Sequence, residues 1–133
     1  MSHGSCQCGQ VVFDLKATLS PVFYCYCRTC RKLSGSAFSL VTRVEKASFH
    51  FIKGDACLSP YESSPGKIRY HCQYCFSPIY VETQSQPDFV RVRLGLLDFE
   101  PDIEIKGHIW LSHKPSYVKI ADSLPQFDEW PDD

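Results

Sequence analysis

The sequence predicts an all-β fold of short strands in one small domain. Apolar and β-prone residues recur in short runs, and Phe89-Val90-Arg91-Val92-Arg93-Leu94 alternates over most of its length. We find no long helical period, no repeat and no linker. The 133 residues suffice for one modest core. We therefore expect a single domain over residues 1–133, with a core of about 3–126 and an irregular, acidic C-terminal tail from Lys114 on.

The expected strands follow one another at short intervals. The first covers residues 10–16 and ends before Ser20-Pro21. Further strands are expected at residues 22–24, 37–44, 47–52, 58–62, 67–71, 78–82, 89–94, 103–105 and 108–111. A single helical turn is expected at residues 28–33, closed by Ser34-Gly35-Ser36. Ser63-Ser64-Pro65-Gly66 predicts a turn between two strands.

Composition excludes several classes of partner. The net charge is −1, so there is no basic excess that would favour nucleic acid. No apolar run approaches the roughly 18 residues that span a bilayer, and the N-terminus does not resemble a signal peptide. We expect a cytoplasmic protein without nucleic-acid or membrane partners, in a compartment where thiols stay reduced.

Eight cysteines in such a chain indicate metal binding. Seven of them fall in three close units, namely Cys6-Gln7-Cys8, Cys25-Tyr26-Cys27-Arg28-Thr29-Cys30 and Cys72-Gln73-Tyr74-Cys75. A disulfide within a Cys-x-Cys pair would close a small, strained ring, and the expected compartment is reducing. We expect two zinc ions per chain, held at two sites of different kinds.

The first site combines two close pairs that are far apart in sequence: Cys6, Cys8, Cys72 and Cys75. Four thiolates complete the tetrahedron that zinc prefers, so this site would be closed and structural. On a straight strand, residues two apart stand roughly 6.5 Å from each other, which is too far for two sulfurs on one zinc. We expect the chain to turn at the glycines that flank the first pair, Gly4 and Gly9.

The second site has only three thiols, at Cys25, Cys27 and Cys30. A fourth ligand position would remain for water or a substrate thiol, as in catalytic zinc sites, where the metal holds a thiol as the more nucleophilic thiolate. Two alternatives stay open. Cys57 would make the site structural if it were the fourth ligand, or the three thiols would form an empty or redox-active cluster. A lone cysteine such as Cys57 is most often buried as a small apolar residue.

The ordered motifs resemble the glutathione-dependent formaldehyde-activating enzyme family, which includes S-(hydroxymethyl)glutathione synthase and centromere protein V-like proteins. They comprise the three cysteine units and Gly4-Ser5-Cys6-Gln7-Cys8-Gly9, Arg31-Lys32, Ser34-Gly35-Ser36-Ala37-Phe38, Ser63-Ser64-Pro65-Gly66, Phe76-Ser77-Pro78, Gly95-Leu96-Leu97-Asp98 and His108-Ile109-Trp110. The resemblance runs to about Gln126. It implies a β-tent fold of short antiparallel sheets around zinc, with a structural zinc at the first site and a labile, catalytic zinc at the second. It also implies a carbon–sulfur lyase that joins glutathione and formaldehyde as a hemithioacetal.

Two residues depart from the pattern of that family. Tyr26 stands where the family usually has His between the first two cysteines of the central unit. The thiols remain, but tyrosine titrates near 10 and is a poor base at neutral pH. Phe76 stands where the family usually has Gly after Cys75. Since Gly tolerates positive φ, we expect the turn at Phe76 to close differently.

Cations near the second site are candidates for binding the carboxylates of glutathione. Arg28, Arg31 and Lys32 lie in or just after the central cysteine unit. Further candidates are Arg43, Lys67 and Arg69. Except for Arg28, which lies inside the cysteine unit, each of them is more often an ordinary solvated charge than a ligand contact.

Two histidines are candidate proton carriers, because imidazole titrates near neutrality. They are His71 and His108, although His71 precedes Cys72 and a structural role there is equally plausible. Aromatic residues around the third cysteine unit are expected in the core rather than at a substrate site: Tyr70, Tyr74, Phe76 and Tyr80.

Two rival functions remain from the sequence. One is a non-catalytic zinc module that binds another macromolecule. The other is the same enzyme class acting on a different glutathione adduct.

Overall fold

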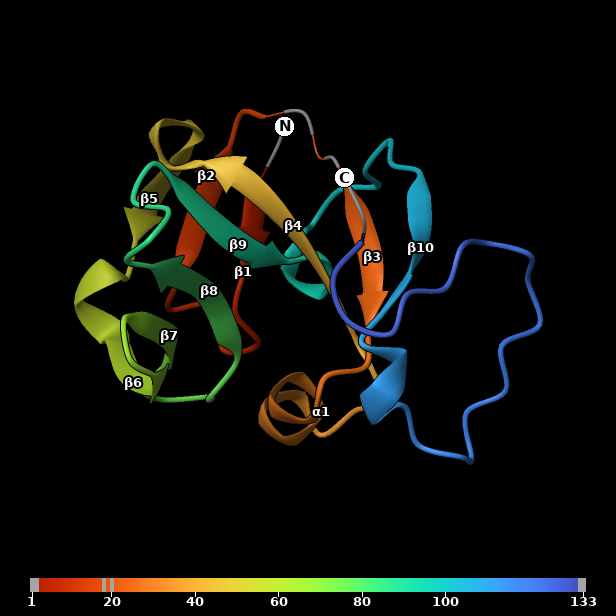
Figure 1. Ribbon diagram of the computed structural model, residues 1–133. Coiled ribbons are helices and arrows are strands. Elements are labelled where there is room, and N and C mark those ends of the chain that lie inside the picture. Colours follow the sequence, from red (N-terminus) through yellow and green to blue (C-terminus); the bar gives the residue numbers. More distant parts are fainter. Residues whose placement is uncertain (1–2, 18, 20, 132–133) are drawn as a thin grey trace.

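The computed structural model describes residues 3–17, 19 and 21–131 as a mostly β protein, which confirms the all-β prediction (Figure 1). The strands are β1 His3–Ser5, β2 Val12–Leu15, β3 Val22–Cys25, β4 Ser39–Glu45, β5 Phe49–Lys53, β6 Leu58–Ser64, β7 Lys67–Cys72, β8 Pro78–Thr83, β9 Phe89–Arg93 and β10 Ile105–Ile109. The helical segments are α1 Arg28–Ser34 and four 3-10 turns, η1 Lys46–Ser48, η2 Asp55–Cys57, η3 Leu94–Leu96 and η4 Leu111–His113.

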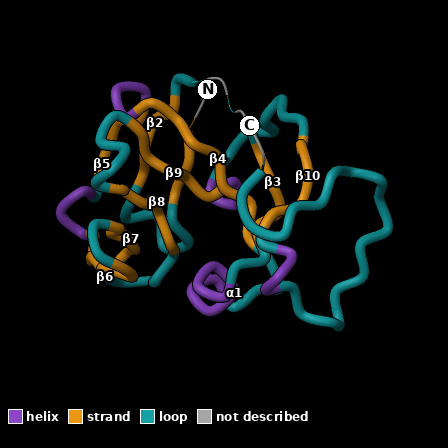
Figure 2. Tube along the Cα trace, viewed as in Figure 1, coloured by secondary structure: helices purple, strands orange, loops and turns teal. Residues whose placement is uncertain are grey.

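The strands form two sheets. The smaller has the order β1-β2-β5 and the larger the order β10-β3-β4-β9-β8-β7-β6 (Figure 2). All pairs are antiparallel except β10 with β3, which is parallel. The larger sheet carries the predicted helical turn, α1, between its neighbouring strands β3 and β4. The fold therefore places α1 and the cysteines that flank it beside the face of the larger sheet.

Two strand predictions need correction. His3–Ser5 forms β1, which the sequence did not indicate, because this short segment pairs with β2 at the edge of the small sheet. The two short strands expected around Gly107 are one strand, β10, with a register shift between Ile105 and Gly107. A Cβ at Gly107 would lie 2.6 Å from the carbonyl oxygen of Pro125, so glycine is needed where the tail approaches β10.

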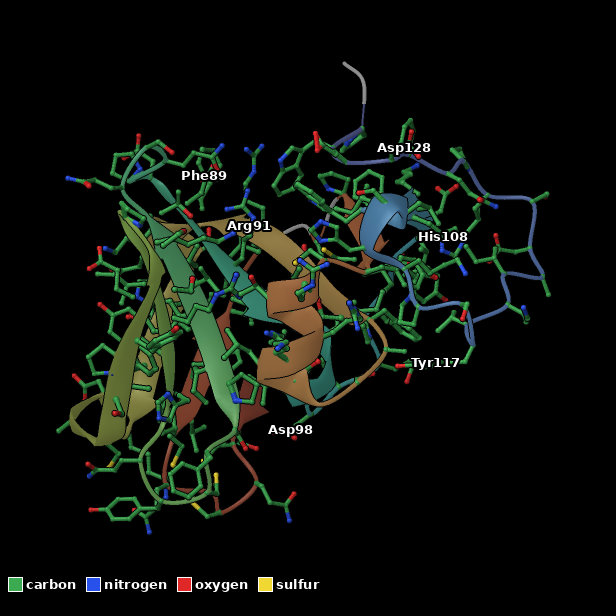
Figure 3. All side chains as sticks on the ribbon, turned by 60° about the horizontal axis from the view of Figure 1, so that its bottom comes forward. Phe89, Arg91, Asp98, His108, Tyr117 and Asp128 are labelled. Carbon is green, nitrogen blue, oxygen red and sulfur yellow. The ribbon has the colours of Figure 1, made fainter. Side chains whose placement is uncertain are left out.

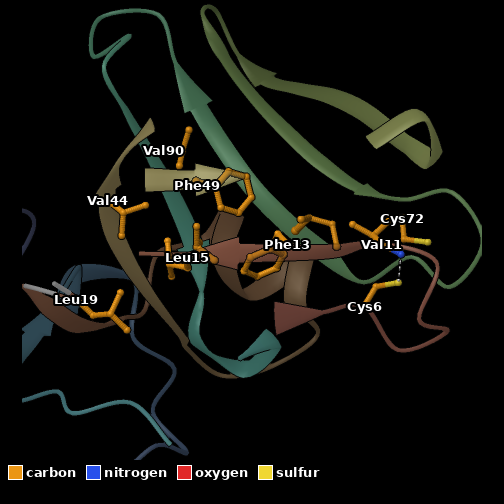
Figure 4. Close-up of a cluster of buried hydrophobic side chains, with 11 residues drawn as sticks. Cys6, Val11, Phe13, Leu15, Leu19, Val44, Phe49, Cys72 and Val90 are labelled. Atoms are coloured by element: carbon orange, nitrogen blue, oxygen red, sulfur yellow. Dashed lines mark hydrogen bonds between the residues drawn. The ribbon is translucent and has the colours of Figure 1, made fainter. Parts of the chain in front are cut away.

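The main core lies between the two sheets (Figure 4). It is built from fully buried side chains that include Phe13, Leu15 and Val90. Cys6 and Cys72 belong to the same cluster, so one set of cysteines closes the end of the core. Burial of such side chains is the main favourable contribution to folding.

The aromatic residues around the third cysteine unit divide into two groups. Tyr70 and Tyr80 stack with ring centroids 4.6 Å apart on β7 and β8. Tyr74 and Phe76 are 61% and 69% exposed, so the prediction that they belong to the core is wrong. They lie in the turn after β7, outside the pleated face that would bury them.

The C-terminal tail has little regular secondary structure among its described residues, and it runs beside β10 as a wide loop (Figure 1). Its backbone pairs with β10 through His108 N–H to Pro125 O at 2.9 Å and Phe127 N–H to His108 O at 2.9 Å. Phe127 packs against a second buried cluster, whereas Tyr117 is 73% exposed and does not anchor the tail. The acidic Asp132 and Asp133 lie outside the described residues. Among the described residues, no helix is both long and apolar enough to span a membrane.

Candidate metal centres and the cleft beside them

One group of thiols has the geometry of a closed zinc site. We call it the four-cysteine cluster: Cys6, Cys8, Cys72 and Cys75. Their sulfurs all lie within 4.8 Å of one another, with Sγ–Sγ distances of 3.6 Å for Cys6–Cys8 and 3.7 Å for Cys8–Cys72. Four sulfurs about 2.3 Å from a tetrahedral zinc would be about 3.8 Å apart. The donor set therefore fits a zinc ion with every ligand position filled by protein.

Two turns bring these sulfurs together. After Cys6 the chain folds back through a Gly9 N–H to Cys6 O hydrogen bond of 3.1 Å, with Gly9 at φ +79°, as expected for the glycine-flanked pair. After Cys72 a second turn closes through Phe76 N–H to Cys72 O at 2.9 Å. Phe76 itself adopts φ +65°. The expectation that this turn would close differently is therefore wrong, because Phe76 takes the conformation that glycine favours.

A second group of thiols, the three-cysteine cluster, comprises Cys25, Cys27 and Cys30. Cys25 ends β3, Cys27 caps the N-terminus of α1 and Cys30 lies in its first turn. The Cys25 and Cys30 sulfurs are 3.8 Å apart, and all three lie within 4.8 Å of one another. These distances fit three corners of a zinc tetrahedron. Hydrogen bonds from the Cys25 thiol, and then from the Cys27 thiol, lower the pKa of Cys30 far below its ordinary value.

Within the described residues no other His, Cys, Asp or Glu joins the three-cysteine cluster as a fourth ligand. Cys57 belongs to neither cluster and packs against the main core instead. Its backbone N–H donates to Gly54 O, and its carbonyl accepts from Gln73 N–H. This placement agrees with a small apolar role for Cys57 and gives no support to a second closed site.

A cleft of about 470 Å³ opens beside the three-cysteine cluster. One wall is the face of the larger sheet, and the other holds the cluster with Trp110, His113 and Trp130. The Trp110 and Trp130 rings meet edge to face with centroids 5.9 Å apart, so the tail supplies part of the wall. The cleft has the size and concave form of a small-molecule site.

The charges that line the cleft are all positive. Six cations contribute to its walls: Arg28, Arg43, Lys67, Arg69, Arg91 and Arg93. No Asp or Glu of the described part of the chain lines it. Burial, and then the charges of neighbouring arginines, lower the pKa of Lys67 and of Arg91. Burial also lowers the pKa of Arg93, while the Cys30 thiolate opposes that shift. The cleft is therefore an electropositive site beside the three-cysteine cluster, suited to an anionic ligand.

Only some of the candidate cations line the cleft. Arg28 lines the cleft, as do the further candidates Arg43, Lys67 and Arg69. Arg31 and Lys32 are not among the lining residues. The Arg31 Nε–H donates to the carbonyl of Tyr26 at 3.2 Å, and Lys32 is exposed on the outer side of α1.

Neither candidate proton carrier lines the cleft. His108 is buried, and both of its ring nitrogens are occupied, Nδ1 by the Tyr26 hydroxyl at 2.8 Å and Nε2 by the Asp122 carboxylate at 3.0 Å. His71 lies on β7 near the ring of Phe76. The imidazole in the cleft is that of His113, whose Nδ1 accepts the Arg28 backbone N–H at 3.2 Å.

Four further residues of the cleft were missed by the sequence reasoning: Arg91, Arg93, His113 and Trp130. For two of them a signal was present, because the alternation Val90-Arg91-Val92-Arg93 puts both arginines on one face of β9. The valines are buried in the core face, so the arginines face the cleft. Nothing in the sequence indicates that His113 and Trp130 would reach the same place.

Comparison with known proteins identifies the family. A family model described as glutathione-dependent formaldehyde-activating enzyme matches residues 1–113. The chain belongs to this family. The match confirms the resemblance drawn from the cysteine motifs, and it suggests a function related to glutathione and formaldehyde activation. It ends before the tail, so Trp130 lies outside the part of the chain that the family model matches.

A similar solved structure supports the fold. The crystal structure of a Rhodobacter sphaeroides protein matches with a TM-score of 0.66 and 17% sequence identity, covering 80% of this chain and 98% of that one. At 17% identity, the similarity between the two proteins shows a shared fold and nothing about a shared function. No curated protein matches the chain.

Proposed function

We propose that the chain is a zinc-dependent carbon–sulfur lyase that resembles S-(hydroxymethyl)glutathione synthase. Its reaction adds the thiol of glutathione to a small electrophile such as formaldehyde, or cleaves such an adduct. The observation that carries the proposal is the three-cysteine cluster at a cleft whose six charged lining residues are all cations. Glutathione brings a thiol and two carboxylates, which match the cluster and the cations respectively.

The two clusters have different roles in this proposal. The four-cysteine cluster would hold a structural zinc, because its donor set leaves no ligand position open. The three-cysteine cluster would hold the labile zinc. When bound there, zinc supplies a Lewis acid that lowers the pKa of an incoming thiol and favours its thiolate.

The chain's own residues then orient the substrates. Arg28, which lies inside the central cysteine unit, and the cleft cations Arg43, Lys67 and Arg69 bind the carboxylates of glutathione by charge-assisted hydrogen bonds. Trp110 and Trp130 reduce the access of water to the reacting sulfur. His113 Nδ1 accepts the Arg28 backbone N–H, so in the neutral ring Nε2 carries the proton and can donate a hydrogen bond to the product oxygen.

The test compares wild type with Cys27→Ser in an NMR exchange assay of S-(hydroxymethyl)glutathione formation from glutathione and formaldehyde. We expect Cys27→Ser to lose about 100-fold or more of the enzyme-dependent rate while keeping the zinc of the four-cysteine cluster, since a general acid–base and metal contribution of that size is typical. Cys57→Ala is the matched control, because Cys57 belongs to neither cluster. Unchanged turnover in Cys27→Ser protein that retains its structural zinc would exclude the proposed function.

A further inference from the structure

The positive charge of the cleft is arranged as an ordered face of the larger sheet. We call five residues the cation face: Arg43, Lys67, Arg69, Arg91 and Arg93. The strand registers place Arg43 opposite Arg91, Arg91 opposite Val81, and Val81 opposite Arg69. Three arginines therefore lie in one row across β4, β9, β8 and β7, and the other two cations lie two residues along from this row on β7 and β9. Figure 3 labels Arg91 on β9, with His108 on the side of the tail.

Without a bound anion, the cation face lowers the stability of the fold, because its positive charges repel one another. Like charges directly opposite each other on neighbouring strands are destabilising, and Arg43 and Arg91 are such a pair. Among the described residues no carboxylate forms an ion pair with any member of the cation face. A cost of this kind is typical of sites where a ligand supplies the missing charge.

Arg93 is the member of the face that most clearly lacks a partner. It is only 9% exposed, it lines the cleft, and its guanidinium makes no hydrogen bond with another described residue. Its guanidinium nitrogens are not among the fully buried unpaired polar atoms of the described residues, so they reach the cleft, where a carboxylate can bind them. The strand register puts Arg93 opposite Val41, and Val41 opposite Phe23, two residues before Cys25, so in the sheet Arg93 lies closer to Cys25 than Arg91 does.

The charge of the thiols does not account for the whole face. Three thiolates around a divalent zinc carry a net charge of −1. Glutathione with an ionised thiol adds about two more negative charges, because its ammonium group offsets one carboxylate. Six cations line the cleft, so positive charge remains when both are present. Formaldehyde is neutral, so it would not compensate this remaining positive charge.

We propose that Arg93, supported by Arg91, forms a subsite for a carboxylate carried by the electrophile. The substrate class is then an aldehyde or α-oxo acid whose carboxylate is next to the reacting carbonyl. This inference rests on the proposed function and specifies its second substrate. The electrophilic carbon must lie against the thiol sulfur, so a carboxylate one bond away meets the buried cation on the thiol side of the face.

The chemical step balances without any redox partner. A bond forms between the thiol sulfur and the carbonyl carbon, and the carbon–oxygen π pair moves to oxygen. The proton that the thiol gives up ends on that oxygen. The guanidinium of Arg93 neutralises the carboxylate beside the developing alkoxide, and it thereby lowers the cost of two adjacent negative charges.

The kinetic test compares glyoxylate with formaldehyde as the electrophile, at fixed glutathione, in wild type, Arg93→Gln, Arg93→Lys and Arg91→Gln. We expect wild type to prefer glyoxylate, and both glutamine variants to lose about tenfold or more in kcat/KM for glyoxylate, mainly through KM. Formaldehyde turnover should stay within about threefold, and Arg93→Lys should recover part of the glyoxylate activity.

The control variant is Lys53→Gln, which changes an exposed cation of the small sheet. An equal loss for both electrophiles, or a rise only in KM for glutathione, would overturn the inference.

A binding measurement separates this inference from the proposed function. Glyoxylate is titrated without thiol, by saturation-transfer NMR, onto wild-type, Cys27→Ser, Arg91→Gln and Arg93→Gln protein. Binding that persists in Cys27→Ser and weakens about tenfold or more in Arg91→Gln supports the subsite even if no turnover is found. Binding unaffected by Arg91→Gln and Arg93→Gln would overturn the subsite while leaving the proposed function to the Cys27→Ser assay.

Discussion

Tyr26, which lies between Cys25 and Cys27, has a structural role in the loop that carries these two thiols. It is 2% exposed, and its hydroxyl meets His108 Nδ1 at 2.8 Å. Burial, and then the negative charge of Asp122, raise the pKa of Tyr26, so the hydroxyl stays neutral. Its hydrogen bond runs away from the cleft and into a chain that ends at the Asp122 carboxylate. Tyr26 therefore holds the loop between Cys25 and Cys27 and does not act as a base.

Replacing Tyr26 by Phe should destabilise the protein by about 1–3 kcal/mol, because the buried His108 Nδ1 would lose its partner. Tyr24→Phe is the matched control, since the Tyr24 ring stacks on the same imidazole but its hydroxyl makes no hydrogen bond to a described residue. Urea unfolding of both zinc-loaded variants measures the difference. Equal losses in the two variants would contradict the role given to the Tyr26 hydroxyl.

At the scale of elements, the sequence was most informative where a strand or turn depends on its own residues. The alternation in β9 and the glycine after α1 predicted those elements, and Gly35 does end α1 in the left-handed conformation. The spacing within each cysteine unit is local, and the four ligands that zinc prefers predicted that the two distant cysteine pairs would meet in one cluster. Pairing between distant strands could not be predicted. The cation face exists only through the register of β4, β9, β8 and β7, and Trp130 reaches the cleft only because the tail pairs with β10.

The turn between β7 and β8 carries a measurable strain. Phe76 is at φ +65° and its ring is 69% exposed, so the residue has the cost of a left-handed conformation with little burial to offset it. Phe76→Gly should therefore stabilise the protein by about 1 kcal/mol. Thermal unfolding of the zinc-loaded protein would measure this gain. Phe76→Ala keeps the unfavourable φ and serves as the control, and a glycine variant no more stable than the alanine variant would contradict the prediction.

At the scale of the whole molecule, the two sulfur clusters are joined to different parts of the fold. The four-cysteine cluster links the N-terminal segment to the end of β7 and shares Cys6 and Cys72 with the main core. The three-cysteine cluster belongs to a smaller buried group with Ile109, at the side of the larger sheet that carries the tail. Loss of metal from the first should therefore affect folding, and loss from the second should affect the cleft.

Cys72→Ser and Cys27→Ser should consequently behave as opposites. Cys72 is fully buried, and its sulfur lies 3.7 Å from that of Cys8, 64 residues away in the chain. A metal that closes so long a loop removes much of the conformational freedom of the unfolded chain. We expect Cys72→Ser to unfold or aggregate, and Cys27→Ser to keep a cooperative melting transition with one zinc per chain instead of two.

Zinc stoichiometry measured before and after mild chelation, alongside melting curves, tests the expectation for each variant. A Cys72→Ser protein with the wild-type melting curve would contradict the structural role of the four-cysteine cluster, and a Cys27→Ser protein that still binds two zinc ions would contradict the labile site.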